Sequence, residues 1–112
     1  MKEKSFAFAI RCVKCYQYLQ NNKKEYVLSK QFLRSGTSIG ANIREAEHAQ
    51  SKADFINKIS VSLKEANETA YWLELLHESC YLESEHFDSI YFDCIEILKL
   101  LTTVVKTSKN NG

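Results

Sequence analysis

Apolar residues keep a helical spacing straight through a stretch of this chain that otherwise looks like a loop. Positions 35–40 read Ser-Gly-Thr-Ser-Ile-Gly, a composition typical of turns. The apolar residues around them nevertheless recur at intervals of three, four and seven, as one face of an α-helix requires: Leu28, Phe32, Ile39, Ile43 and Ala46. A glycine inside a helix costs up to about 1 kcal/mol relative to alanine. A continuous helix here therefore predicts that Gly36 and Gly40, four residues apart on one flank, allow another helix to approach closely.

The rest of the chain contains few residues that would interrupt helices. Among 112 residues there is no proline, and the only other glycine is Gly112. The hydrophobic content of 45% is ordinary for a globular protein, and the length suits one modest core. We therefore predict a single all-α domain spanning residues 1–112.

Periodicity divides the chain into four amphipathic helices, at about 3–21, 23–48, 52–79 and 85–107. Asn22 with Glu25, and Ser51 with Asp54, have the spacing of N-terminal capping boxes. Residues 108–112 read as a polar, frayed tail. Short connections favour an antiparallel up-down-up-down four-helix bundle.

The first helix has two apolar stripes instead of one. Phe8, Cys12 and Leu19 belong to one stripe, and Phe6 and Ile10 belong to the other. Together the stripes cover about half the circumference at 100° per residue, which is wide for a helix with one buried face.

From the N-terminal residues and the hydropathy pattern we predict a cytoplasmic protein. No apolar run approaches the roughly 20 residues that span a bilayer. The N-terminal apolar segment is short and lacks a cleavage site, so we do not expect a secretion signal.

Positive charge is clustered locally although the whole chain is nearly neutral. Fifteen basic and fourteen acidic residues give a net charge of +1. One face of the second predicted helix gathers the candidate nucleic-acid-binding residues Lys23, Lys30, Arg34 and Arg44, with His48 below them. Such a face can bind a phosphate backbone by counterion release. The alternatives are a solvated helix surface, or arginines paired with acids of a neighbouring helix such as Glu65 or Glu68.

A second apolar strip on the third predicted helix is a candidate oligomer interface. It contains Val61, Trp72 and Leu75, roughly opposite the core stripe. A tryptophan with aliphatic neighbours on one face suggests a protein–protein contact. The alternative is a bundle tilted enough to bury the strip internally.

Residues with metal-ligand chemistry occur in the chain, but their spacing favours structural roles. Cys12, Cys15, His77 and Cys80 could be imagined as a metal or redox site. The two N-terminal cysteines, however, continue an apolar stripe, where free cysteine behaves as a small hydrophobe. We therefore predict neither a metal nor a cofactor.

Two Glu-x-x-His pairs, Glu45/His48 and Glu83/His86, resemble the ligand spacing of di-iron bundles. An up-down topology would put the pairs at opposite ends, more than about 30 Å apart at 1.5 Å per residue. The glycines of 36–40 lack the Gly-Lys-Ser/Thr ending and preceding strand of a phosphate loop. Nothing places two carboxylates beside a nucleophile, so we predict no catalytic residues and no enzyme.

Three motifs resemble a known family. They are Arg-Ser-Gly-Thr-Ser-Ile-Gly-Ala-Asn-Ile-Arg-Glu-Ala at 34–46, Ser-Lys-Ala-Asp-Phe at 51–55 and Lys-Glu-Ala-Asn-Glu-Thr-Ala-Tyr-Trp-Leu-Glu-Leu-Leu at 64–76. The chain resembles the four-helix-bundle proteins encoded in intervening sequences of bacterial 23S ribosomal RNA genes. That family is related to the accessory protein of diversity-generating retroelements.

The resemblance implies a four-helix protomer that assembles into a ring-like homopentamer. For the retroelement relatives it also implies a basic surface that binds nucleic acid and a reverse transcriptase, although those relatives are markedly more basic than this chain. Six positions match the family's polar motif residues: Arg34, Asn42, Glu45, Lys64, Glu65 and Glu68. We predict that some of these form a hydrogen-bonded network between the second and third helices or across subunits, since buried charges need partners.

Overall fold

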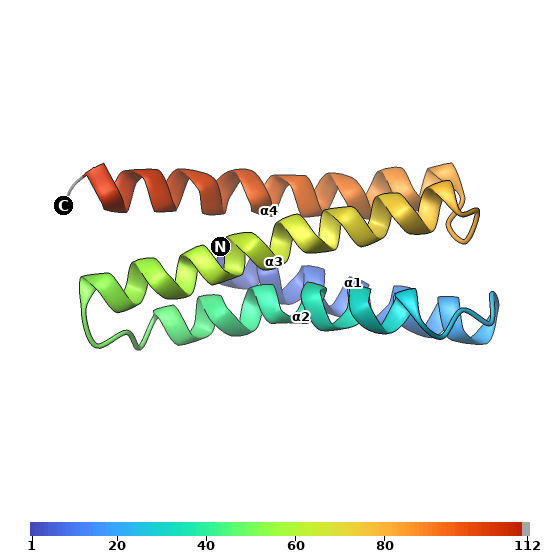
Figure 1. The fold of residues 1–112 in the computed structure, drawn as a ribbon, viewed down its shortest axis with the longest axis horizontal. Helices are drawn as coiled ribbons and strands as arrows, with labels where there is room; N and C mark the ends of the chain where they lie inside the picture. Colours follow the sequence, from blue (N-terminus) through green and yellow to red (C-terminus); the bar gives the residue numbers. More distant parts are fainter. Residues whose placement is uncertain (111–112) are drawn as a thin grey trace.

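The computed structural model describes residues 1–110 and is an antiparallel up-down-up-down four-helix bundle, as predicted. The helices are α1 (Lys2–Asn21), α2 (Leu28–Ala46), α3 (Lys52–Glu78) and α4 (Ser84–Asn110). They run to and fro along one long axis (Figure 1), and the bundle measures 47 × 21 × 20 Å. Consecutive helices pack along each other, whereas α1 and α4 touch over a shorter stretch.

All four helices contribute large side chains to one core. Phe8, Phe32, Leu73 and Ile97 are each at most 2% exposed. The predicted core stripe of α2 is buried from Phe32 to Ala46, whereas Leu28 is half-buried against the core. Helix α2 runs without a break through the glycines. The helical interpretation of this stretch is therefore correct.

The two glycines of α2 lie against α1, which confirms the predicted close approach. A Cβ placed on Gly36 would lie 2.5 Å from Cys12 Sγ, and one placed on Gly40 would lie 3.3 Å from Ser5 Oγ. Gly36 therefore occupies a position where no larger residue fits without movement of its neighbour. Helix α1 docks through its smallest buried side chains, a serine and a cysteine.

Helix α2 begins five residues later than predicted. Asn22 does not start it but ends α1, donating its backbone N–H to the Tyr18 carbonyl at 2.8 Å. Lys24 then adopts a left-handed backbone with φ of 55°, which interrupts the helical path. The capping role belongs to the Glu25 carboxylate, which accepts backbone N–H bonds from Leu28 and Ser29 at 3.0 and 2.7 Å.

The start of α3 follows the predicted cap, and the end of α4 does not follow the prediction. Ser51 Oγ accepts the Asp54 backbone N–H at 3.1 Å, and the Asp54 carboxylate accepts the Gln50 N–H at 3.2 Å. Helix α4 continues to Asn110, so the frayed tail predicted from residue 108 is wrong for residues 108–110; the last two residues lie outside the described part. The pattern of apolar residues ends at Val105, but backbone hydrogen bonding continues beyond it.

Buried hydroxyl groups join α2 to α3 in addition to the apolar contacts. Ser62 Oγ donates to the Ile39 carbonyl at 2.8 Å, and Thr69 Oγ1 bonds Ser35 Oγ at 2.9 Å. All four residues are fully buried. A buried hydroxyl without a partner costs about 1–3 kcal/mol, so these bonds help to fix the register of the two helices.

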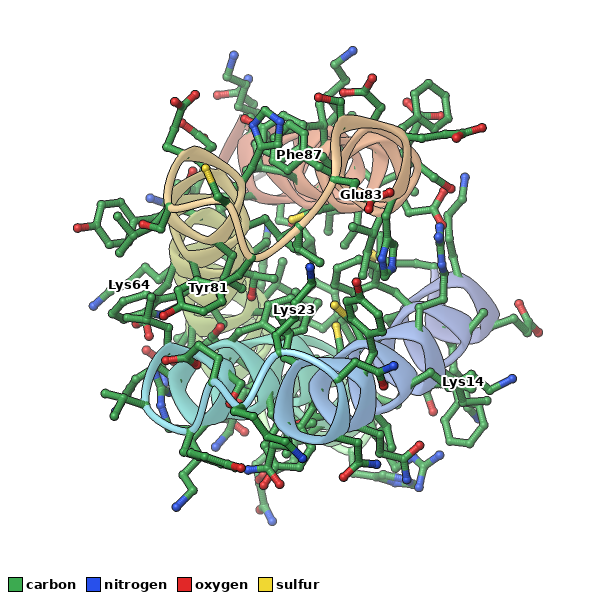
Figure 2. The ribbon with its side chains drawn as sticks, turned by 90° about the vertical axis from the view of Figure 1, so that its right-hand side faces the viewer. Lys14, Lys23, Lys64, Tyr81, Glu83 and Phe87 are labelled. Atoms are coloured by element: carbon green, nitrogen blue, oxygen red, sulfur yellow. The ribbon has the colours of Figure 1, made fainter. Side chains whose placement is uncertain are left out.

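An ion pair and a hydrogen bond join α1 to α4, the pair of packed helices with the smallest area of contact. Arg11 Nη1 contacts Asp93 Oδ2 at 2.6 Å, and Arg11 Nη2 donates to Ser89 Oγ at 3.0 Å. Figure 2 views the bundle along its long axis, from the end where the α1–α2 connection and the α3–α4 turn lie. In this view α1 and α2 form one side of the bundle, and α3 and α4 form the opposite side. The α1–α2 pair and the α3–α4 pair therefore form two opposite sides of a bundle that is nearly square in cross-section, 21 × 20 Å.

Candidate interaction surfaces

Arg34 links α2 to α3 through two carboxylates. Its Nη1 lies 3.2 Å from Glu65 Oε2, and its Nη2 donates to Glu68 Oε2. Trp72 Nε1 donates to the same Glu68 oxygen at 2.9 Å. The Trp72 bond and the Arg34 bonds hold the pKa of Glu68 below its usual value, and the Glu68 bond raises the pKa of Arg34.

This cluster brings together three of the six predicted network residues. Glu45 lies apart from them and pairs with Lys58 of α3 at 3.6 Å. Asn42 donates to the Ser38 carbonyl of its own helix at 2.9 Å. Lys64 is exposed and projects outward from α3 (Figure 2).

The four candidate nucleic-acid-binding residues do not form one surface in the structure. Lys23 lies in the α1–α2 connection and not on α2, which corrects its predicted position. Arg34 is engaged by acids of α3, one of the alternatives that the sequence left open. Lys30 and Arg44 are exposed on the outer side of α2.

The candidate oligomer strip on α3 is only partly accessible in the protomer. Val61, Trp72 and Leu75 are each half-buried, and Trp72 packs against the core. Tyr71 beside it is 58% exposed and meets the Trp72 ring edge-on, with ring centroids 5.1 Å apart. The part of this region most available to a partner is therefore Tyr71.

The second apolar stripe of α1 is the largest unpartnered apolar feature of the first two helices. Phe6 is 57% exposed, and Ile10 and Val13 are exposed beside it. A hollow of about 350 Å³ lies between this stripe and α2, lined among others by Phe6, Gly40 and Arg44. The sequence contained the signal, two apolar stripes on one helix, but did not show which stripe α2 would cover.

The cysteines are arranged as core residues. Cys12, Cys15 and Cys94 are buried, whereas Cys80 is exposed near the α3–α4 turn. Burial raises the pKa of all three buried thiols, for Cys15 and for Cys94 to about 12, so they remain protonated. A thiol held in this form is a poor metal ligand and a poor nucleophile.

The other candidate metal ligands are also dispersed. Glu45 and His48 lie at the α2–α3 turn, and Glu83 and His86 lie at the α3–α4 turn, at opposite ends of the bundle (Figure 1). Within residues 1–110, no three histidine, cysteine or carboxylate side chains are placed to hold a metal ion. No helix in the same range has a stretch long and apolar enough to cross a membrane.

These features define a small all-helical protein built as an antiparallel four-helix bundle with unpartnered apolar surface on its first helix. A family model described as 23S rRNA-intervening sequence protein matches residues 1–103. The chain therefore belongs to the family of 23S rRNA-intervening sequence proteins, as the three motifs indicated.

A solved structure agrees with this assignment. The chain is similar to a protein of unknown function from the S23 ribosomal protein family of Bacteroides thetaiotaomicron VPI-5482, solved by crystallography at 1.70 Å resolution. The TM-score is 0.93 and the sequence identity 61%, over 94% of this chain and 97% of that one. Among curated proteins, the comparison found no match.

Proposed function

We propose that this protein is a non-enzymatic assembly protein whose four-helix protomers associate into a homo-oligomer, with a pentamer as the expected size. The observation that carries the proposal is the exposed stripe of Phe6, Ile10 and Val13 on α1. Contiguous exposed apolar side chains on a small protein mark interaction sites more often than chance exposure does. The family resemblance supports the pentameric size.

Light scattering coupled to size exclusion, at tens of micromolar protomer, tests the proposal. We expect a mass several times that of the 13.0 kDa protomer. A monomer across this concentration range would refute self-association. Phe6→Glu should dissociate the oligomer with unchanged far-ultraviolet circular dichroism. Val27→Glu is the matched control, because it also replaces an exposed apolar side chain by a carboxylate, at a position that is 72% exposed in the α1–α2 connection and away from the stripe.

The half-buried strip on α3 remains a second predicted contact. Trp72→Glu should also dissociate the oligomer if this strip is the interface. Because Trp72 packs on the core, the thermal unfolding of the Trp72→Glu variant must be measured together with its mass in solution. Tyr71→Glu probes the same region through a side chain that is 58% exposed and is therefore the cleaner variant.

Nucleic-acid binding is the second candidate function, favoured by the charge of the first two helices. Residues 1–46 hold nine lysines and arginines against three glutamates, a net charge of +6. Affinity for RNA or DNA should fall steeply with salt and weaken in Lys30→Glu, while Lys64→Glu on the opposite half serves as control. Absent or salt-insensitive binding would reject this function. A reverse-transcriptase-like protein is the expected protein partner if nucleic acid is bound.

A further inference from the structure

Charge is segregated along the chain far more strongly than the net value suggests. Residues 1–46, which form α1 and α2, carry +6, and the remainder carries six lysines against eleven carboxylates, a net charge of −5. The segregation is sharpest over residues 65–98, with nine carboxylates and no lysine or arginine. This segment is the second half of α3, the turn and the first half of α4.

The bundle places the basic charge along the side formed by α1 and α2, and the acidic charge on the opposite side, in the half of α3 and α4 next to their turn. The far half of that side, residues 52–64 and 99–110, holds six lysines and one aspartate. Helices α1 and α2 lie on one side and α3 and α4 on the other (Figure 2). We call the first the basic face, defined by Phe6, Ile10, Lys14, Lys30 and Arg44. The acidic face is defined by Tyr71, Glu74, Glu78, Asp88 and Phe92. Every one of these ten residues is exposed.

Each face combines exposed apolar side chains with charge that is not neutralised within the protomer. Phe92 is 65% exposed, comparable with Phe6 at 57%. Among the ion pairs formed within residues 1–110, none involves Lys14, Lys30 or Arg44, nor Glu74 or Asp88. Both faces therefore have the composition of an interface, an apolar anchor with charged surroundings.

We infer that the basic face of one copy docks on the acidic face of the next, so that the copies associate head to tail. This inference rests on the proposed self-association and specifies its surfaces. Pairing a face with itself would set like charge against like charge, which disfavours a two-fold dimer. A contact between two different faces leaves one of each kind free, so it repeats until a ring closes or a filament grows.

The size of the bundle is compatible with such a contact. The side formed by α1 and α2 is about 30 Å long, from helices of 20 and 19 residues at 1.5 Å per residue, and the bundle is 21 Å wide, which gives a flat projection of roughly 600 Å². The accessible area of a side-chain surface exceeds its flat projection, and a standard protein interface needs about 800 Å² of accessible area from each partner. Most of a side must therefore be used. A contact limited to the tip of the bundle would be too small.

Photocrosslinking from the basic face tests the inference in the assembled protein. Ile10→p-benzoylphenylalanine is mixed with nitrogen-15-labelled unsubstituted protein, so that crosslinks between copies are recognised by mass. We expect crosslinked peptides from residues 65–98 of the labelled copy. Val27→p-benzoylphenylalanine is the matched control, because Val27 is 72% exposed in the α1–α2 connection, outside the basic face.

Each other outcome overturns the inference in a recognisable way. Crosslinks to residues 1–46 of the labelled copy would show like faces in contact, with self-association intact. Crosslinks to nucleic acid in place of protein would assign the basic face to that ligand. A monomer by light scattering, without any crosslink between copies, would remove the proposed function itself.

Mixing two interface variants gives an independent measurement. Phe6→Glu disables only the basic face and Phe92→Glu only the acidic face, so each variant alone should be monomeric. Their equimolar mixture should form a heterodimer of twice the protomer mass, through the two intact faces. If the wild type assembles but a mixture at hundreds of micromolar stays monomeric, head-to-tail docking is wrong. Assembly of the wild type should also weaken roughly tenfold between low and moderate salt.

Discussion

Gly36 of α2 provides a sharp test of the packing between α1 and α2. A methyl group at this position would lie 2.5 Å from Cys12 Sγ and 3.2 Å from Cys12 Cβ. Cys12 is fully buried, so its sulfur cannot swing into solvent to make room. Gly36→Ala should therefore destabilise the protein, although alanine is the better helix former.

The size of the effect follows from two opposing contributions. The gain in helix propensity is about 1 kcal/mol. Overpacking a well-packed core costs about 1–3 kcal/mol, and an overlap this close belongs in the upper part of that range. The expected net result is a free energy of unfolding lower by about 1–2 kcal/mol.

Urea unfolding followed by far-ultraviolet circular dichroism, at a fixed protomer concentration, measures this difference. Gly40→Ala is the matched control, because its nearest neighbour would be Ser5 Oγ at 3.3 Å and the propensity gain should offset most of the contact. In the Gly36→Ala/Cys12→Ala double variant, loss of the sulfur should recover about 1 kcal/mol relative to additivity. If Gly36→Ala is as stable as the wild type, or if the two changes are additive, the proposed steric conflict is wrong.

Three further predictions concern polar contacts. Burial acts to raise the pKa of Glu25, but three backbone N–H donors outweigh it and hold that pKa below its usual value. The ionised Glu25 therefore stabilises the folded protein fully at a pH above the unfolded-state pKa of this residue, and the stabilisation is lost as the pH falls through the folded-state pKa. Glu25→Gln should cost about 1–2 kcal/mol at neutral pH, and a difference from wild type that persists unchanged into acid in urea titrations would contradict this. Ser62→Ala should cost about 1 kcal/mol in the same assay through loss of its bond to the Ile39 carbonyl; an unchanged unfolding midpoint would contradict it. For the partly exposed pair Arg11–Asp93, a double-mutant cycle should give a coupling free energy below about 1 kcal/mol. A larger value would contradict this and would make the ion pair a major contribution to the stability of the α1–α4 contact.

The fold was largely predictable because its signals are local. Four periodic segments, short connections and the Ser51–Asp54 cap are all features of neighbouring residues in the chain. The start of α2 was not predictable in the same way. Asn22 and Glu25 do have capping-box spacing, but the left-handed Lys24 lies between them, so each serves a different helix.

The candidate surfaces were less predictable, because they depend on which helices become neighbours. Pairing of Arg34 with Glu65 and Glu68 was one of two alternatives to nucleic-acid contact, and only the packing of α2 on α3 distinguishes them. The strip of Val61, Trp72 and Leu75 was visible as a second apolar face. Its partial burial within the protomer follows from the same packing.

The number of helices, their order, the close-packing glycines and the family membership could all be inferred from the chain alone, because helical periodicity and short motifs are properties of contiguous residues. Periodicity also places each side chain at an angle around its own helix axis. It does not specify how each helix is rotated toward its neighbours. That rotation, which appears only in the packed bundle, buries Phe8 and Cys12 of α1 and leaves Phe6 and Ile10 in solvent. The arrangement of the helices also places the basic and the acidic segments on opposite sides of the bundle (Figure 2). Side chains that are far apart in the chain acquire a common surface only when the helices pack.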